Sequence, residues 1–401
     1  MAMQQTWRWF GPNDPVTLQE VRQTGAVGIV TALHHIPVGE TWPVDEIRAR
    51  KHAIEAEGLT WSVVESLPVH ECIKTRSGEV GRVLENFKAT LRNLGACGID
   101  TVCYNFMPVL DWSRTDLDAV FTDGSITTKF DAAVFAAFDL FVLRRKDAAR
   151  GYAPEIVRAA ESWCNAADER EKERLVRTVL LGLPGSGEAL TLEKLRAALE
   201  TYDAIDPAAL RDNLHAFLRE VVPVAEESGV LLAVHPDDPP WPLLGLPRVV
   251  STGEDIAGLL RAVDSPSNGI TLCTGSLGAG PRNDLVEIAE RFASRINFVH
   301  LRNVHRDGSG GFVEDNHLEG DVDMFGVIRT ILLEQERRTK AGRADRKMPM
   351  RPDHGHLLLP DEMLAEIRKT RPYPGYSLWG RMRGLAELRG MELGIRRSLG
   401  L

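Results

Sequence analysis

Four short apolar runs in this chain each end on a side chain that can bind a metal ion. The runs are Leu231–His235, Ile270–Cys273, Asn297–His300 and Met348–Asp353, and a helix-like stretch separates each from the next. Two imidazoles, a thiolate and a carboxylate offer a mixed nitrogen, sulfur and oxygen ligand set that suits divalent transition metals. In a barrel of alternating strands and helices, the four run ends meet at one mouth, where such enzymes carry their chemistry. The pattern therefore predicts a metal-centred active site.

Each of these residues also has an ordinary structural explanation. A histidine at a buried strand end, such as His235 or His300, can simply be hydrogen-bonded in the core. A lone free cysteine such as Cys273 is most often a small buried hydrophobic residue. Independent core residues, however, are not expected to fall one per strand end on four consecutive strands. The joint pattern, rather than any single residue, supports the metal site.

Two further residues after the seventh run are candidates for binding a substrate. Arg302 lies two positions after His300, so both side chains share one face of the strand, and its guanidinium can hold a carboxylate bidentately. His317 lies in a polar loop, where it either contacts the substrate or caps the helix that follows. A metal beside a guanidinium suits a sugar acid as substrate.

The segment 351–356, with the sequence Arg-Pro-Asp-His-Gly-His, is the strongest single motif. Asp353 can coordinate a cation while the adjacent His354 acts as an acid or a base near neutral pH. A rim loop with solvated histidines is the alternative interpretation. Tyr376 follows the last run, a place where a tyrosine more often packs than catalyses.

The elements that would position these residues form a repeating pattern of strands and helices. Most of the expected strands are rich in Val, Ile, Leu and Trp with little alternation, as in strands buried on both faces. Helical patterns separate them, for example after the cap signals Asp206-Pro207 and Asn283. Eight such repeats predict the α/β class and a closed (β/α)8 TIM barrel. The expected strands are Trp7–Phe10, Gly28–Leu33, Thr60–Glu65, Thr101–Phe106, Leu231–His235, Ile270–Cys273, Ile296–Leu301 and Met348–Pro352.

The spacing between the fourth and fifth expected strands is far longer than between the others. We interpret residues 111–201 as a helical insertion over the barrel mouth or at a subunit contact, within a single catalytic domain spanning 1–401. This segment contains the charged stretch Asp168–Arg177 and the glycine-rich loop Gly182–Gly187.

Composition and charge restrict the class of protein. A hydrophobic content of 43% permits a large core, and a net charge of −9 argues against a nucleic-acid-binding surface. The five cysteines are widely spaced and odd in number, so we expect no disulfide framework and a cytoplasmic location. Neither a signal peptide nor an apolar run long enough to cross a membrane is apparent.

With these residues in hand, the chain resembles the mannonate dehydratases of hexuronate catabolism. The similarity runs nearly end to end and is carried by long, unusual strings of residues. These are Thr6–Pro15, Thr31–Pro37, Trp61–Ser66, Cys103–Trp112, His235–Pro240 and Asp353–His356. One departure is the stretch Asn303–Gly311, whose composition and length look unusual.

The resemblance implies a xylose-isomerase-like barrel that converts D-mannonate to 2-dehydro-3-deoxy-D-gluconate and water with Mn²⁺ or Fe²⁺. It assigns His354 and Tyr376 as the acid and base, in an order that the sequence does not decide. The ligand set alone would also suit Zn²⁺, so only the resemblance favours manganese or iron. By the same resemblance, the metal ligands are His235, Cys273, His300 and Asp353.

Three other interpretations fit the sequence less well. A metal-dependent sugar isomerase or epimerase on the same barrel typically bridges two metals with several carboxylates, whereas Asp353 is the one acid in the proposed set. A DNA-repair nuclease would need a basic groove. A non-catalytic protein with a closed structural metal site would also use four protein ligands. We further expect a homo-oligomer, a dimer, that acts on a small sugar acid and binds neither nucleic acid nor membrane.

Overall fold

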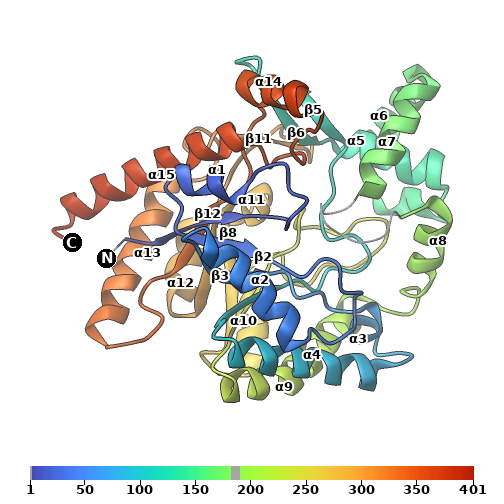
Figure 1. The fold of residues 1–401 in the computed structure, drawn as a ribbon. Coiled ribbons are helices and arrows are strands. Elements are labelled where there is room, and N and C mark those ends of the chain that lie inside the picture. Colours follow the sequence, from blue (N-terminus) through green and yellow to red (C-terminus); the bar gives the residue numbers. More distant parts are fainter. Residues whose placement is uncertain (1, 182–189) are drawn as a thin grey trace.

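The computed structural model describes residues 2–181 and 190–401, and its centre is a closed barrel of eight parallel strands (Figure 1). Neighbouring strands follow the order β1-β12-β9-β8-β7-β4-β3-β2, which closes because β2 also pairs with β1. The predicted barrel is therefore confirmed. Its strands are β1 (Gln4–Arg8), β2 (Gly28–Thr31), β3 (Thr60–Glu65), β4 (Thr101–Tyr104), β7 (Leu231–Val234), β8 (Asn268–Cys273), β9 (Ile296–Leu301) and β12 (Pro349–Pro352).

The first strand differs from its prediction. The apolar run Trp7–Phe10 suggested a later start, but β1 begins at Gln4 and ends at Arg8. Gln4 and Gln5 are drawn into the barrel by parallel pairing with Pro349 and Met350 of β12. Hydrophobicity could not reveal this, because backbone pairing with a distant strand, rather than side-chain burial, fixes where β1 starts.

Helices cover the outside of the barrel. The predicted start of α9 is confirmed, since Asp206 accepts a hydrogen bond from the Ala209 amide and Pro207 occupies the first turn. For α12 the cap is Asp284 rather than Asn283, because the Asp284 carboxylate accepts from the amides of Val286 and Glu287. The helices outside the segment between β4 and β7, together with α9 at its end, are α1 (Leu18–Gln23), α2 (Val44–Ala56), α3 (Glu71–Thr75), α4 (Val80–Ala96), α9 (Pro207–Glu227), α10 (Gly253–Ala262), α11 (Thr274–Ala279), α12 (Leu285–Phe292), η3 (Ala293–Arg295), α13 (Met324–Lys340), α14 (Leu359–Arg368) and α15 (Leu378–Ser398).

The segment between β4 and β7 was predicted to be helical, and this prediction is wrong at its start. The segment opens with an antiparallel hairpin. Its strands β5 (Asp116–Val120) and β6 (Ile126–Phe130) join β10 (Asn303–Arg306) and β11 (Phe312–Asp315) in a second sheet of order β10-β11-β6-β5. The unusual stretch Asn303–Gly311 therefore contains β10 and the turn that leads into β11. The helical part comprises α5 (Ala132–Ala137), the π-helix η1 (Phe138–Leu143), the 3-10 helix η2 (Ala148–Gly151), α6 (Pro154–Ala166), α7 (Glu169–Leu181) and α8 (Leu192–Glu200).

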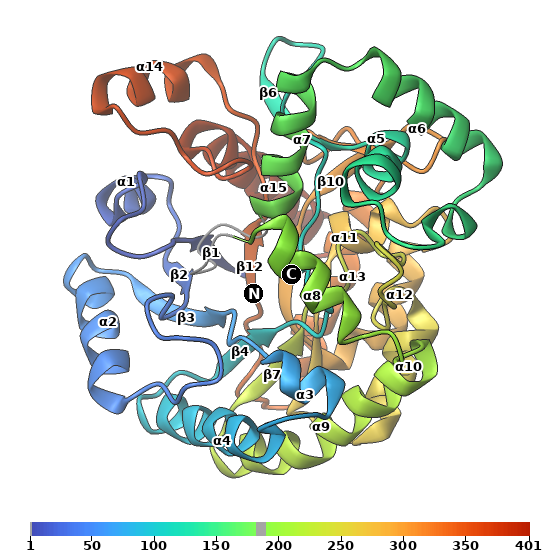
Figure 2. The ribbon, with the colours of Figure 1, turned by 90° about the vertical axis from the view of Figure 1, so that its right-hand side faces the viewer.

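This inserted region stands on the side towards which the barrel strands run. Figure 2 looks onto that side and shows α7 and α8 in front of the barrel, with α5 and α6 beside them. The predicted loop Gly182–Gly187 lies outside the described residues. In the two described ranges, no helix combines the length and the apolar character needed to cross a membrane.

Small and apolar side chains fill the inside of the barrel beneath the mouth. Val30, Val63, Cys103, Ala233 and Phe298 form a separate buried cluster contributed by five different strands. Two residues further along β3, β7 and β9, the inward positions become polar. The barrel therefore has a closed apolar floor, and the mouth above it holds the polar side chains.

Candidate active site

Three of the four predicted metal ligands meet at the barrel mouth. One potential ligand atom from each of His235, Cys273 and His300 lies within 4.8 Å of the other two. His235 directly follows β7, Cys273 ends β8, and His300 lies in β9 as the Cα partner of Cys273. Parallel strands in register turn paired side chains towards the same face, which brings the thiol and the imidazole together.

The surroundings of both histidines leave one ring nitrogen free for a metal. The Nδ1 atom of His235 donates to the Pro236 carbonyl oxygen at 2.7 Å, so the lone pair of Nε2 is available. In His300, Nε2 lies 3.5 Å from the Glu65 carboxylate and 3.2 Å from Arg351 Nε, whereas the buried Nδ1 has no hydrogen-bond partner among the described residues. For His235, the carbonyl behind the imidazole fixes the tautomer that leaves Nε2 open. The residues present therefore fit a metal ion.

Asp353 lies at the edge of this group. Its Oδ2 atom is 3.5 Å from Cys273 Sγ and 3.8 Å from His300 Nδ1, but Asp353 is not part of the group whose ligand atoms all lie within 4.8 Å of one another. Its carboxylate is also paired with Arg351 and lies 3.5 Å from Arg302 Nη1. Burial opposes ionisation, but the neighbouring groups, Arg351 foremost and Arg302 among them, together outweigh it and hold the pKa of Asp353 well below its usual range.

A continuous network of buried ion pairs surrounds the candidate metal site. It links four guanidinium groups with four carboxylates, so the network carries no net charge. Burial raises the pKa of Asp238, yet Arg114 and Arg302 together hold it well below the usual range. The members, in order of contact, are Arg8, Glu65, Arg351, Asp353, Arg302, Asp238, Arg114 and Glu314, all buried.

The two predicted acid–base residues lie side by side. The rings of His354 and Tyr376 are 5.2 Å apart, and Gly355 pairs with Tyr376 through a short parallel bridge. Glu314 of β11 lies 3.3 Å from His354 Nδ1. Burial raises the pKa of Tyr376 to about 12, so its hydroxyl stays protonated at neutral pH.

The two predicted substrate-binding residues differ in their surroundings. Arg302 is held by Asp238 at 2.6 Å and Glu314 at 2.7 Å, and its Nη2 atom is buried without a hydrogen-bond partner in residues 2–181 and 190–401. His317 is buried against Gly384 of α15, and burial lowers the pKa of its imidazole to about 4. His317 does not cap the following helix, because Asp323 is the N-cap of α13.

Sequence reasoning missed the residues that hold the ligands and His354 in place. Glu65 and Arg351 stand behind His300, while Glu314 and Arg114 approach from the second sheet and the loop before it. Only Glu65 carried a usable signal, because it ends the third predicted strand as the ligands end theirs. Nothing in the local sequence separates Glu314 from other acids in polar loops.

A potential metal site, the two residues predicted to act as acid and base, and unpaired buried donors thus share one barrel mouth. The model of the D-mannonate dehydratase (UxuA) family matches residues 3–399 of the chain. A mannonate dehydratase of Marinomonas sp. is 54% identical over 398 residues, covering 99% of this chain and 100% of the relative. Another, from Chromohalobacter salexigens, is 54% identical over 395 residues, covering 98% and 99%.

Solved structures agree with this similarity. The crystal structure of mannonate dehydratase from Streptococcus suis serotype 2 covers 100% of this chain and 95% of its own, with a TM-score of 0.77 and 34% identity. A xylose isomerase-like TIM barrel protein from Mycobacterium smegmatis, covering 94% and 87% at a TM-score of 0.50 and 15% identity, shares the fold alone. The chain belongs to the D-mannonate dehydratase family.

Proposed function

We propose that this barrel mouth dehydrates D-mannonate to 2-dehydro-3-deoxy-D-gluconate and water, a step of hexuronate catabolism. The observation that supports this proposal most is that His235, Cys273 and His300 converge in a chain that belongs to this metal-dependent hydro-lyase family. The proposed ligands of the divalent metal are His235, Cys273, His300 and Asp353.

The balance of buried charge supports a monocarboxylate as the substrate. The surrounding guanidinium and carboxylate groups cancel, which leaves the metal and the Cys273 thiolate as the uncompensated charges. A divalent ion beside one thiolate carries a single excess positive charge, and one substrate carboxylate neutralises it. Buried charge is costly unless it is paired. A neutral sugar, the substrate of an isomerase or epimerase, would leave this charge unmatched.

A bound divalent ion would act as a Lewis acid towards the carboxylate and a neighbouring hydroxyl group of the substrate. The chain's own residues then move the protons. Tyr376 stays protonated because its pKa is raised, which supports it as the acid that protonates the departing C3 oxygen. His354, next to Tyr376, is left as the base that removes the C2 proton. The unpaired Nη2 atom of Arg302 is available to orient the carboxylate.

Manganese or ferrous iron is the proposed metal. Two imidazoles, one thiolate and one carboxylate leave room for further oxygen ligands from the substrate at a metal that accepts more than four. The family resemblance supports Mn²⁺ or Fe²⁺ over Zn²⁺. Metal analysis of the protein purified without added metal, followed by reloading with each ion in turn, tests this choice.

One experiment tests the reaction itself. The metal-free protein is reloaded with Mn²⁺ or Fe²⁺, supplied with D-mannonate and assayed for a 2-keto-3-deoxy acid. We expect turnover that depends on the added metal. Absence of turnover with every divalent metal tried would contradict the dehydratase assignment. The variants Cys273→Ala and His354→Asn separate the roles, since the first should lose the metal and the second should retain it.

We also propose that the protein is a homodimer, with α14 at the interface. Four large hydrophobic residues are the most exposed ones in the described part of the chain. They are Val120 (76%), Leu359 (75%), Met363 (64%) and Ile367 (77%), and the last three lie on α14 at intervals of four residues. Arg371, just after α14, pairs with Asp118 on β5, so α14 and the hairpin that carries Val120 are neighbours.

The charge pattern of α14 supports a second copy as the partner. Glu362 and Glu366 precede Lys369 along the helix and its end, so antiparallel pairing about a two-fold axis sets opposite charges face to face. Sedimentation tests this, because the pair Met363→Glu and Ile367→Glu should yield monomers. The control Phe325→Glu, at an exposed site on α13, should not. Monomeric unaltered protein would contradict the proposal.

A cytoplasmic location completes the proposal. All five cysteines are free in the structure, and Cys273 must remain a thiol to bind a metal. Fractionation of the source cells, with assay of each fraction, tests the location.

A further inference from the structure

The proposed ligands occupy only half of the barrel mouth. They lie on or directly after β7, β8, β9 and β12, which are consecutive in the closed strand order. In that order β2 is four strands from β8 in either direction, so the end of β2 faces Cys273 across the mouth. The ends of β1 and β2 therefore form a second half, whose polar side chains the metal chemistry leaves without a role.

Arg8 is the inward-facing residue at the end of β1. It is the Cα partner of Val30, which belongs to the apolar floor, so its side chain also enters the barrel. The guanidinium is 1% exposed and lies 3.4 Å from the Glu65 carboxylate. That contact is an ion pair made by Nη1 and is not a hydrogen bond; neither Nη1 nor Nε has a hydrogen-bond partner in the part of the chain that the structure describes. A buried guanidinium with unused donors is costly unless another molecule accepts from them.

His34 follows β2 on the adjacent edge of the mouth. Its buried Nε2 atom also lacks a hydrogen-bond partner among the described residues. Burial, with a smaller contribution from the nearby Arg8, lowers the pKa of His34 to about 3, so the ring is neutral. A neutral imidazole can donate or accept, which suits a hydroxyl group better than a carboxylate.

Phe10 connects these two residues to the proposed acid. Its ring lies 4.8 Å from Tyr376, 6.0 Å from His34 and 4.9 Å from the Arg8 guanidinium carbon. The unpaired donors are therefore grouped around the same aromatic ring that packs on Tyr376. A substrate whose C3 oxygen reaches Tyr376 would extend its remaining carbons towards this group.

We propose that Arg8 and His34 form a subsite that hydrogen-bonds the distal hydroxyl groups, on C5 and C6, of the sugar acid. This inference rests on the proposed function. It adds to that function the residues that select a substrate by the length of its carbon chain. The carboxylate belongs at the opposite half, because the excess positive charge lies at the metal. The charge of Arg8 is already matched by Glu65, which leaves its donors free for neutral oxygens.

Substrates of two lengths test the subsite. L-Erythronate has the C2 and C3 configuration of D-mannonate but lacks C5 and C6. On the Mn²⁺-loaded enzyme, the KM for D-mannonate and the inhibition constant of L-erythronate are measured in parallel. In His34→Leu we expect the KM for D-mannonate to rise about tenfold, as for one lost hydrogen bond. The value of kcat and the inhibition constant of L-erythronate should stay within about twofold of the unaltered enzyme.

Two more variants make the outcome specific. His35→Leu is the matched control, since His35 is the neighbouring residue but is exposed and contacts Glu46; both constants should stay unchanged. Arg8→Lys keeps the positive charge opposite Glu65 but removes the several N–H donors of the guanidinium. It should again raise the KM for D-mannonate and leave the inhibition constant of L-erythronate unchanged.

An unchanged KM in His34→Leu would overturn the subsite. So would an equal rise in both constants, because that would mean disruption of the mouth as a whole or binding of the carboxylate at Arg8. Failure of the proposed function would look different, since the unaltered, metal-loaded enzyme would then not turn over D-mannonate at all.

Discussion

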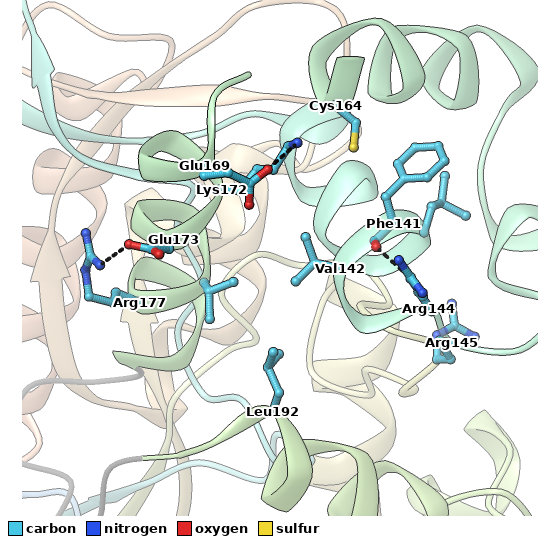
Figure 3. A pocket seen from close by; sticks show the side chains of 12 residues that line it. Phe141, Val142, Arg144, Arg145, Cys164, Glu169, Lys172, Glu173, Arg177 and Leu192 are labelled. Carbon is cyan, nitrogen blue, oxygen red and sulfur yellow. Dashed lines mark hydrogen bonds and ion pairs between the residues drawn. The ribbon is translucent and has the colours of Figure 1, made fainter. Parts of the chain in front are cut away.

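The barrel mouth and the inserted region arrange their charged side chains differently. In the insertion, a cavity of about 980 Å³ lies between η1 and α7, with Leu192 of α8 at one end (Figure 3). Its wall carries exposed ion pairs such as Arg177–Glu173, where both side chains are about 70% accessible, besides the pair of Arg145 with the buried Asp139. At the mouth, the charged partners are almost fully buried and several donors have no hydrogen-bond partner among the described residues.

This difference shows that the presence of a cavity does not by itself locate the chemistry. Exposed ion pairs are screened and contribute little, so the insertion cavity can form without any functional demand on its charges. Buried charges must be paired, and unpaired buried donors must be compensated. Those costs make sense at the mouth if a metal and an anionic substrate bind there. The predictions below pair each change at the mouth with a matched change in the insertion.

The largest loss of metal binding and activity is expected for substitution of Cys273, with Cys164 as the control. Cys273→Ala removes the proposed thiolate ligand and should abolish both stoichiometric metal binding and activity. Cys164→Ala, in the wall of the insertion cavity, should leave both unchanged. Metal content by mass spectrometry and the rate of 2-keto-3-deoxy acid formation check the pair. Equal effects of the two substitutions would break the comparison.

The next effect concerns the two tyrosines. Tyr376→Phe removes the proposed acid and should lower kcat by roughly 10²- to 10⁴-fold, the usual contribution of general acid–base catalysis, while the metal is retained. Tyr152→Phe removes a hydroxyl that donates to Asp139 within the insertion, and kcat should remain within about twofold. Steady-state kinetics with metal analysis distinguish these outcomes. Retained activity in Tyr376→Phe would remove Tyr376 from the mechanism.

Stability should separate the two regions as well. Arg114→Leu leaves Asp238 and Glu314 buried with one partner fewer, and breaking such a pair typically costs about 3–5 kcal/mol. Arg177→Leu breaks an exposed pair on α7 and should produce no resolvable change. Urea unfolding followed by circular dichroism measures both variants. A mild effect of Arg114→Leu would mean that the network tolerates an unpaired charge, which would weaken the charge argument for a monoanionic substrate.

The contrast between the regions also explains what the sequence could predict. Strands β3 and β9 were predicted with their observed bounds because buried parallel strands are continuous apolar runs. His235, Cys273 and His300 followed from their positions at strand ends, since barrel topology alone brings such ends together. The barrel and the convergence of these three side chains were therefore accessible from local patterns.

Partners that meet through long-range pairing were not accessible. Glu314 reaches His354 because β11 pairs with β6, through Phe312 and Phe130, far apart in the sequence. The strand Asp116–Val120 is polar and half exposed, so its sequence carried no strand signal. Tyr376 needed the family resemblance, because its proximity to His354 depends on how the loop after α14 folds back.

The smallest expected effect is a pH dependence of stability that arises from Glu314. Burial raises the pKa of this carboxyl, but Arg302 and then His354 and Arg114 outweigh it and lower the pKa from 4.5 to about 2. Because the folded pKa is depressed, its stabilising contribution is complete above about pH 4.5 and is lost as the pH falls towards 2; the shift corresponds to about 3 kcal/mol. The difference in unfolding free energy between the unaltered chain and Glu314→Gln should therefore shrink over that interval. Glu173→Gln, at the exposed wall of the insertion cavity, should follow the unaltered chain at every pH. A constant difference for Glu314→Gln would mean that its ion pairs add no net stability, and the mouth would then resemble the insertion in this respect.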